Sequence, residues 1–186
     1  MIKRGFKLIE YENRLERVQS MMSRYKIDIL LITSEFFMRY FTGFSTQFWQ
    51  SPTRPWFLII PLEGFPKAVI PEIGFSAMQK TWIKEIFTWQ SPRPDDEGIS
   101  LLLNLIKEIP SKFNNIGAEL GREMSLRMPL VDFFSLKSNL SKNIIDASPM
   151  LWKLRIIKSN SEIDKINHIC KITSDAYENL PLLIKE

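Results

Sequence analysis

The segment from Thr46 to Trp56 combines the side-chain types that best suit recognition of a peptide or of another protein. It holds Trp49, Arg54 and Trp56 among polar residues, with prolines that stiffen the backbone. Exposed tryptophan and arginine carry much of the binding energy at protein interfaces. The segment therefore offers binding chemistry. The alternative is that Trp56 begins a buried strand and that Arg54 makes an ordinary surface contact.

Two further groups carry reactive side chains, but their spacing favours structural roles. His168, the only histidine, stands two residues before Cys170, the only cysteine. On a helix this spacing separates side chains by about 200°, so the pair cannot share a metal ion. We expect a histidine on the helix surface and a buried thiol. The run Asp95-Asp96-Glu97 lacks a calcium-loop pattern and suits the start of a helix.

Glu119 lies in the run Gly117-Ala118-Glu119-Leu120-Gly121, at the end of a predicted strand. It has no histidine partner that would make it a general base, and the glycines lack the spacing of a phosphate loop. We expect its carboxylate to accept hydrogen bonds from backbone N–H groups of the neighbouring loop. No catalytic residue and no metal ligand is predicted in this chain.

Composition excludes several classes of protein. Of the 186 residues, 45% are hydrophobic, which is ample for a packed core. The net charge of +4 comes from basic residues scattered among acidic ones, so nucleic-acid binding is not expected. No apolar run reaches the ~20 residues that cross a bilayer, and no signal-peptide pattern is present. With one cysteine suited to a reducing compartment, we expect a cytoplasmic protein without a membrane partner.

Alternating helical and extended patterns predict the elements that carry these residues. Helices are expected near residues 9–25, 37–40, 75–80, 99–106 and 129–140, and strands near 27–32, 56–60, 67–70, 86–89, 115–118 and 143–146. The second and third strands flank the turn at Pro61 to Gly64 and form a hairpin, while Ser34 caps and Gly43 ends the second helix. This order predicts an α/β fold, with a mixed β-sheet of about six strands flanked by helices.

Two helical segments follow the predicted core, which ends near Ala147. Ser148 is expected to cap a segment that continues to Ile157, and Ser159 and Glu162 have the spacing of a capping box. The last helix has an apolar face that no later residue covers, formed by Ile163, Ile166, Ile169 or Cys170, Thr173, Ala176 or Tyr177, and Leu180. We therefore expect one domain at 1–147, followed at 148–186 by a linker and the first helix of a truncated second domain.

Three motifs, taken in order, resemble the N-terminal domain of the creatinase, prolidase and aminopeptidase P family of metallopeptidases. They are Tyr40-Phe41-Thr42-Gly43-Phe44, Ile116-Gly117-Ala118-Glu119, and Leu154-Arg155-Ile156-Ile157-Lys158-Ser159 followed by Glu162-Ile163. The resemblance implies a ribonuclease H-like sheet domain that precedes a "pita-bread" catalytic domain. That second domain binds two divalent ions, manganese, cobalt or zinc, on two Asp, one His and two Glu. None of those ligands can be placed in this chain.

The resemblance implies the non-catalytic N-terminal domain of an Xaa-Pro dipeptidase or aminopeptidase P-like enzyme. Its expected roles are contacts in a homodimer and a wall over the partner's active site, which limits the proline-containing peptides that enter. By this analogy Arg54 pairs with a substrate carboxylate, while Trp49 or Trp56 forms an apolar wall. The chain alone is expected to be inactive, and the full-length protein to be a metallohydrolase.

Other functions remain open at the level of sequence. One is a non-enzymatic protein-binding module of the same fold, which an absence of the metal ligands downstream would favour. Another is the N-terminal domain of a creatinase-like hydrolase of small amides. A nucleotide-binding α/β domain is disfavoured, because the run Thr33-Ser34-Glu35-Phe36 after the first strand offers no close backbone approach for phosphate.

Overall fold

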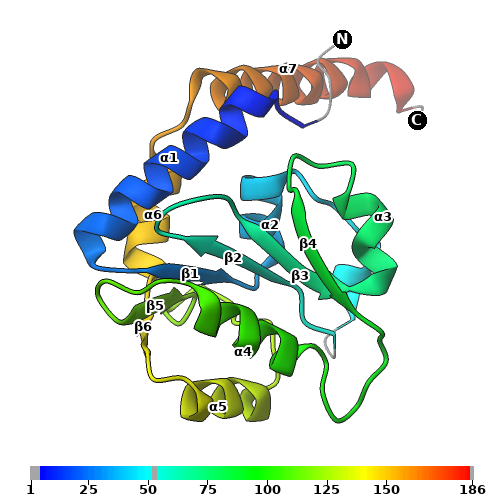
Figure 1. Cartoon of the computed structure of the whole chain (residues 1–186). Helices are drawn as coiled ribbons and strands as arrows, with labels where there is room; N and C mark the ends of the chain where they lie inside the picture. Colours follow the sequence, from blue (N-terminus) through cyan, green and yellow to red (C-terminus); the bar gives the residue numbers. More distant parts are fainter. Residues whose placement is uncertain (1–4, 52–53, 185–186) are drawn as a thin grey trace.

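The computed structural model describes residues 5–51 and 54–184 and shows a central sheet covered by helices on both faces (Figure 1). Six strands follow in the order β4-β3-β2-β1-β5-β6. They are β1 (Ile29–Ile32), β2 (Phe57–Pro61), β3 (Lys67–Pro71), β4 (Glu85–Trp89), β5 (Asn115–Ala118) and β6 (Asn143–Asp146). Strand β2 is antiparallel to β1 and β3, and the other pairs are parallel. The predicted mixed sheet is confirmed.

All helices but the last form two layers, one on each face of the sheet. These helices are α1 (Leu8–Tyr25), α2 (Glu35–Thr42), α3 (Phe75–Met78), α4 (Ile99–Glu108), α5 (Leu130–Asn139) and α6 (Ser148–Ile156), and the last helix is α7 (Asn160–Leu183). There are also 3₁₀ turns η1 (Gln47–Gln50) and η2 (Glu72–Gly74). Successive side chains of a strand point to opposite faces. Leu30 and Ile32 therefore join the core under α1, α2 and α6, while Ile29 and Leu31 join the core under α4 and α5.

Caps define both ends of α2, whereas the side-chain cap predicted for α6 is absent. Ser34 Oγ accepts a hydrogen bond from Phe37 N–H at 3.4 Å, and Gly43 ends α2 with φ 76°, both as predicted. A side chain at Gly43 would also meet Tyr11, whose Oη lies 2.4 Å from the position of a Cβ. The predicted capping role of Ser148 is wrong. Ser148 lies inside α6, and its hydroxyl donates to Asp146 Oδ1 at 2.5 Å.

Helix α6 belongs to the core of the sheet domain rather than to a free linker. Met150, Leu151 and Leu154 are almost fully buried in the same apolar cluster as α1 and α2. This packing occurs because three apolar side chains at helical spacing cover the sheet. A division of the chain at Ala147 would separate α6 from that core.

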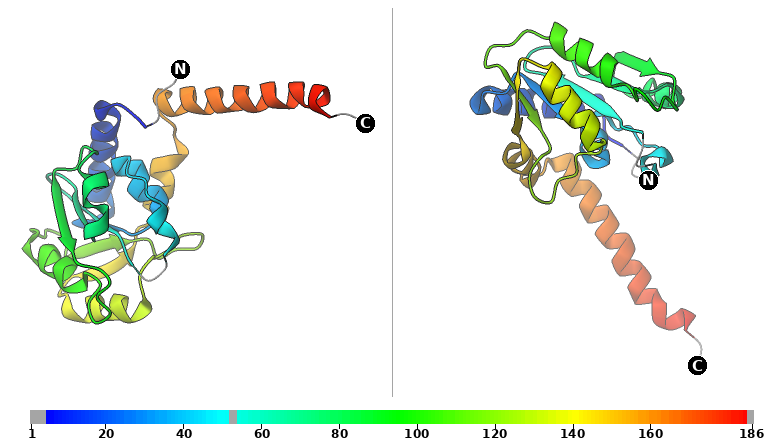
Figure 2. Two further views of the ribbon diagram at one scale, coloured as in Figure 1. Left: turned by 90° about the vertical axis from the view of Figure 1, so that its right-hand side faces the viewer. Right: turned by 90° about the horizontal axis from the view of Figure 1, so that it is seen from below.

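Helix α7 leaves the body of the domain and extends away from it in both views of Figure 2. Its expected apolar face is exposed: Ile163, Ile166 and Leu180 each keep more than 40% of their accessible surface. His168 lies on the helix surface, as expected. The expectation of a buried thiol is wrong, because Cys170 is exposed on this isolated helix.

Candidate functional site

The segment from Thr46 to Trp56 packs its two tryptophans into the domain instead of presenting them to solvent. Trp49 is 3% and Trp56 1% exposed, and their ring centroids lie 5.6 Å apart. The ring of Phe44, 5.4 Å from that of Trp56, extends this aromatic group. The expectation of exposed rings is therefore wrong, and the alternative that Trp56 begins a buried strand is confirmed, because β2 starts at the next residue. The cause is the large apolar area of their rings, which is buried beside α2 and β2.

Arg54 is the half-buried cation of this segment, and Pro52 and Thr53 beside it lie outside the described residues. Burial alone would raise the pKa of Glu97, but hydrogen bonds from Trp89 Nε1 at 2.9 Å and from Arg93 N–H at 2.7 Å outweigh burial and lower it. The charge of Arg54 adds a smaller contribution in the same direction. Asp96, in the same run, accepts from Ser100 N–H in the first turn of α4, as its predicted helix-start role requires. The contact of Arg54 with a substrate stays a prediction.

Glu119 anchors the loop after β1, as the sequence predicts. Its Oε2 accepts from the N–H groups of Thr33 at 2.7 Å and Ser34 at 2.9 Å, and its Oε1 lies 2.5 Å from Ser34 Oγ. The residue is 1% exposed. Burial raises the pKa of Glu119, although the hydrogen bonds from Ser34 and Thr33 oppose this shift. The side chain is occupied in holding two strand ends together, so it is not a free base.

A buried arginine on α1 holds the first turn of α7, and the sequence reading missed it. Arg14 is 2% exposed, and its guanidinium lies 4.2 Å from the ring centroid of Phe6 and 4.1 Å from that of Tyr40. It donates to Glu10 Oε1 at 3.1 Å, Tyr40 O at 2.6 Å and Glu162 Oε1 at 3.1 Å. Its position on the apolar stripe of α1, between Tyr11 and Val18, was the signal that could have revealed it.

The capping box of α7 completes this contact and is confirmed. Ser159 N–H donates to Glu162 Oε2 at 2.9 Å, and Glu162 N–H donates to Ser159 Oγ at 3.2 Å. Ser159 Oγ also donates to Glu10 at 2.8 Å. The start of α7 is thereby tied to α1 and α2. We call the group formed by Glu10, Arg14, Tyr40, Ser159 and Glu162 the junction network.

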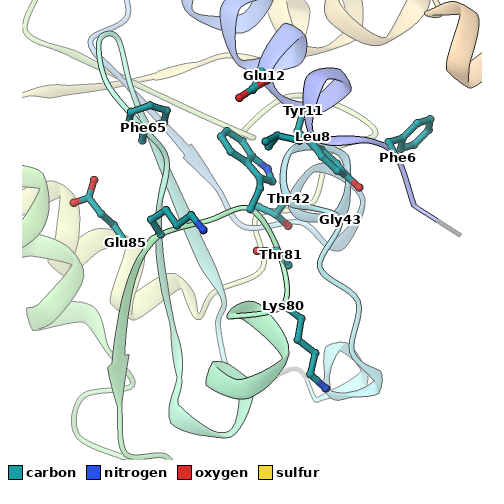
Figure 3. Close-up of a pocket in the computed structure, with 12 residues that line it drawn as sticks. Phe6, Leu8, Tyr11, Glu12, Thr42, Gly43, Phe65, Lys80, Thr81 and Glu85 are labelled. Carbon is teal, nitrogen blue, oxygen red and sulfur yellow. The ribbon is translucent and has the colours of Figure 1, made fainter.

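A cavity of about 760 Å³ lies between the start of α1, the end of α2 and the β2–β3 hairpin (Figure 3). The stacked rings of Tyr11 and Trp82, with centroids 6.3 Å apart, form part of its wall. Phe65, near the tip of the hairpin, and Lys80 also line it. Its size is within the range of ligand pockets, and its aromatic wall suits an apolar group. The side chains that line it offer no nucleophile paired with a base.

The described residues contain no group of three or more His, Cys, Asp or Glu side chains that could hold a metal ion. They therefore do not fit the two-metal centre that the family resemblance implies, and no catalytic step is derived from them. Within the described ranges, none of the helices is long and apolar enough to cross a membrane.

Comparison with known families shows which family the chain belongs to. Residues 14–157 match the model of the Creatinase/Prolidase N-terminal domain. The chain belongs to this family. The match contains the sheet, the segment from Thr46 to Trp56 and α6, and it confirms the resemblance drawn from the three motifs.

Solved structures of dipeptidases share the fold of this family member. A prolidase from Thermococcus sibiricus is 20% identical with a TM-score of 0.74, and the alignment covers 91% of this chain and 43% of that one. A Xaa-Pro dipeptidase from Bacillus anthracis is also 20% identical, with a TM-score of 0.72, and the alignment covers 94% of this chain and 44% of that one. Dipeptidase PepE from Mycobacterium ulcerans is 20% identical with a TM-score of 0.66, and the alignment covers 86% of this chain and 40% of that one. The chain thus spans less than half the length of these proteins. Among curated proteins, no significant match was found.

Proposed function

We propose that this chain is the non-catalytic N-terminal domain of an Xaa-Pro dipeptidase-like metallohydrolase. The observation that carries the proposal is the family match over residues 14–157. It is supported by a fold shared with a prolidase and a Xaa-Pro dipeptidase of which this chain covers only 43% and 44%. In this proposal the two metal ions and the hydrolytic step belong to a second domain of a cytoplasmic, homodimeric protein.

Helix α7 is the proposed connection to that second domain. Its exposed isoleucines form an apolar stripe that a packed neighbour would remove from water. Its first turn is held by the junction network, so the direction of the helix is set by the N-terminal domain. The helix would thus present one fixed apolar face to the catalytic domain.

We further propose that residues 46–51 together with Arg54, which we call the access loop, narrow the entrance to the partner's active site. Arg54 would pair with the carboxylate of a short substrate. Because Trp49 and Trp56 are buried, their part is to support the loop from beneath rather than to form an apolar wall. Removing Arg54 in the full gene product should therefore raise KM for short proline peptides more than kcat falls. An unchanged KM would contradict this role.

A protein-binding module of the same fold is the second candidate. The observation that favours it is a group of exposed apolar side chains on α5, where Leu130, Val131 and Phe134 are 67%, 72% and 60% exposed.

A creatinase-like hydrolase of small amides is the third candidate, and it would use this domain as the proposed dipeptidase does. Cleavage of creatine or other small amides, but not of Xaa-Pro peptides, would identify it.

Calorimetry with manganese separates the enzyme from the binding module. The 186-residue chain should show no stoichiometric, tight binding, and the full gene product should bind two ions per chain. Tight binding by the 186-residue chain would contradict the proposed non-catalytic role. A full gene product that binds no manganese, cobalt or zinc would favour the binding module.

A further inference from the structure

We infer that Arg127 is the residue that positions the access loop. The inference rests on the proposed function, because the access loop has its role only there. Arg127 lies in the segment between β5 and α5, 78 positions along the chain from Trp49, and its guanidinium donates a hydrogen bond to the carbonyl oxygen of Trp49. The side chain therefore joins η1 to the segment that follows β5.

The guanidinium of Arg127 holds Trp49 by two different interactions. Besides its hydrogen bond to the carbonyl, its Cζ lies 5.7 Å from the centroid of the Trp49 ring, within the range of a cation–π contact. In the described part of the chain no carboxylate forms an ion pair with Arg127. Its charge is therefore directed at Trp49 rather than neutralised elsewhere.

The backbone of Arg127 is fixed to the rigid centre of the domain. Its N–H donates to Thr33 Oγ1 at 3.1 Å, and Thr33 Oγ1 lies 3.3 Å from Glu119 Oε2. Thr33 follows β1 and Glu119 follows β5, two neighbouring inner strands of the sheet. The backbone of Arg127 is thus held in place by hydrogen bonds, as the backbone of a positioning residue must be.

The described residues 46–51 form hydrogen bonds among themselves that do not reach the rest of the domain. Phe48 N–H bonds to Thr46 Oγ1 at 3.2 Å, and Ser51 N–H bonds to Phe48 O at 3.1 Å, both within the loop. The buried indole N–H groups of Trp49 and Trp56 meet no acceptor among the described residues. The hydrogen bond from Arg127 to the Trp49 carbonyl therefore links η1 to the segment between β5 and α5.

Hydrogen exchange on the 186-residue chain tests the inference without substrate or metal. In Arg127→Ala, amide exchange in residues 46–51 should rise about tenfold or more, because a hydrogen bond from a charged group is lost. Exchange in β1 should stay at its wild-type rate. Arg127→Lys, which keeps a charged donor, should recover part of the protection. Arg122→Ala, an exposed arginine of the same segment, is the matched control and should leave the loop unchanged.

Two results would overturn the inference. One is unchanged exchange of residues 46–51 in Arg127→Ala. The other is an equal rise in β1, which would show that Arg127 stabilises the whole domain rather than the loop. Neither result bears on Xaa-Pro hydrolysis by the full gene product. Failure of that activity would count against the proposed function and leave the exchange result standing.

Discussion

Arg14 and Glu119 are both charged and almost completely buried, but their surroundings differ. Arg14 faces two carboxylates and three aromatic rings, so its charge is compensated where it lies. Glu119 faces only neutral donors from Thr33 and Ser34, and its pKa is raised by burial. Arg14 joins segments 148 positions apart and fixes α7. Glu119 holds the interior of the sheet domain. The comparison separates contacts that fix the start of α7 from contacts that keep the sheet domain folded.

The largest expected effect comes from removing Arg14. Arg14→Met leaves Glu10 and Glu162 without their cation, and breaking a buried ion pair costs about 3 kcal/mol or more. Urea unfolding should show this loss, and the first turn of α7 should lose its hydrogen-exchange protection. The control is Arg24→Ala, an exposed arginine on the same helix, which should stay within about 0.5 kcal/mol of wild type. If the two variants were equally stable, the junction network would not hold α7.

Asp28 sharpens the comparison, because its pKa shifts in the opposite direction from that of Glu119. Burial alone would raise the pKa of Asp28. However, N–H groups of Phe113, Lys112 and Asn115 and the Ser111 hydroxyl donate to the carboxylate and lower its pKa below the usual 3.8. Asp28→Asn should cost about 1–3 kcal/mol, because an amide NH₂ then faces these donors.

The pH dependence of Asp28 follows from the direction of its shift. The folded chain binds fewer protons at this group than the unfolded chain, so the stabilisation is present above pH 3.8 and is lost as the pH falls through the lower folded pKa. The stability difference between wild type and Asp28→Asn should shrink in that range. A difference that is constant from neutral to acidic pH would contradict the account.

Glu119→Gln should change the free energy of unfolding less than Asp28→Asn does, and this change should depend on pH in the opposite direction. Because the pKa of Glu119 is raised above 4.5, the folded chain binds more protons there than the unfolded chain. Wild-type stability should therefore fall relative to Glu119→Gln as the pH rises from 4.5 through the folded pKa. Urea titrations across this range measure the slope. The exposed Glu108→Gln should show no such trend, and the same slope in both variants would contradict the assignment to Glu119.

The sequence correctly predicted those strands and side-chain roles that depend on the local order of residues. Strands β5 and β6 were placed at their observed bounds because short apolar runs end at polar residues or turns. The roles of Ser159 and Glu162 followed from their spacing alone. Glu119 was assigned correctly because a carboxylate at a strand end, without a histidine, meets the backbone of the adjacent loop.

What the sequence did not predict depends on contacts between distant segments. Arg14 could be recognised as a charge on an apolar stripe, but its partners Tyr40 and Glu162 come from α2 and α7. Trp49 is likewise contacted by Arg127, which comes from the segment between β5 and α5. A loop rich in tryptophan resembles an exposed binding surface until the chain that covers it is placed.

The central claim is that the 186-residue chain is a non-catalytic domain. It is tested most directly by assaying Xaa-Pro dipeptide hydrolysis with manganese for the 186-residue chain and the full gene product side by side. The account predicts no turnover by the chain and turnover by the full product. Cleavage by the 186-residue chain itself would contradict it.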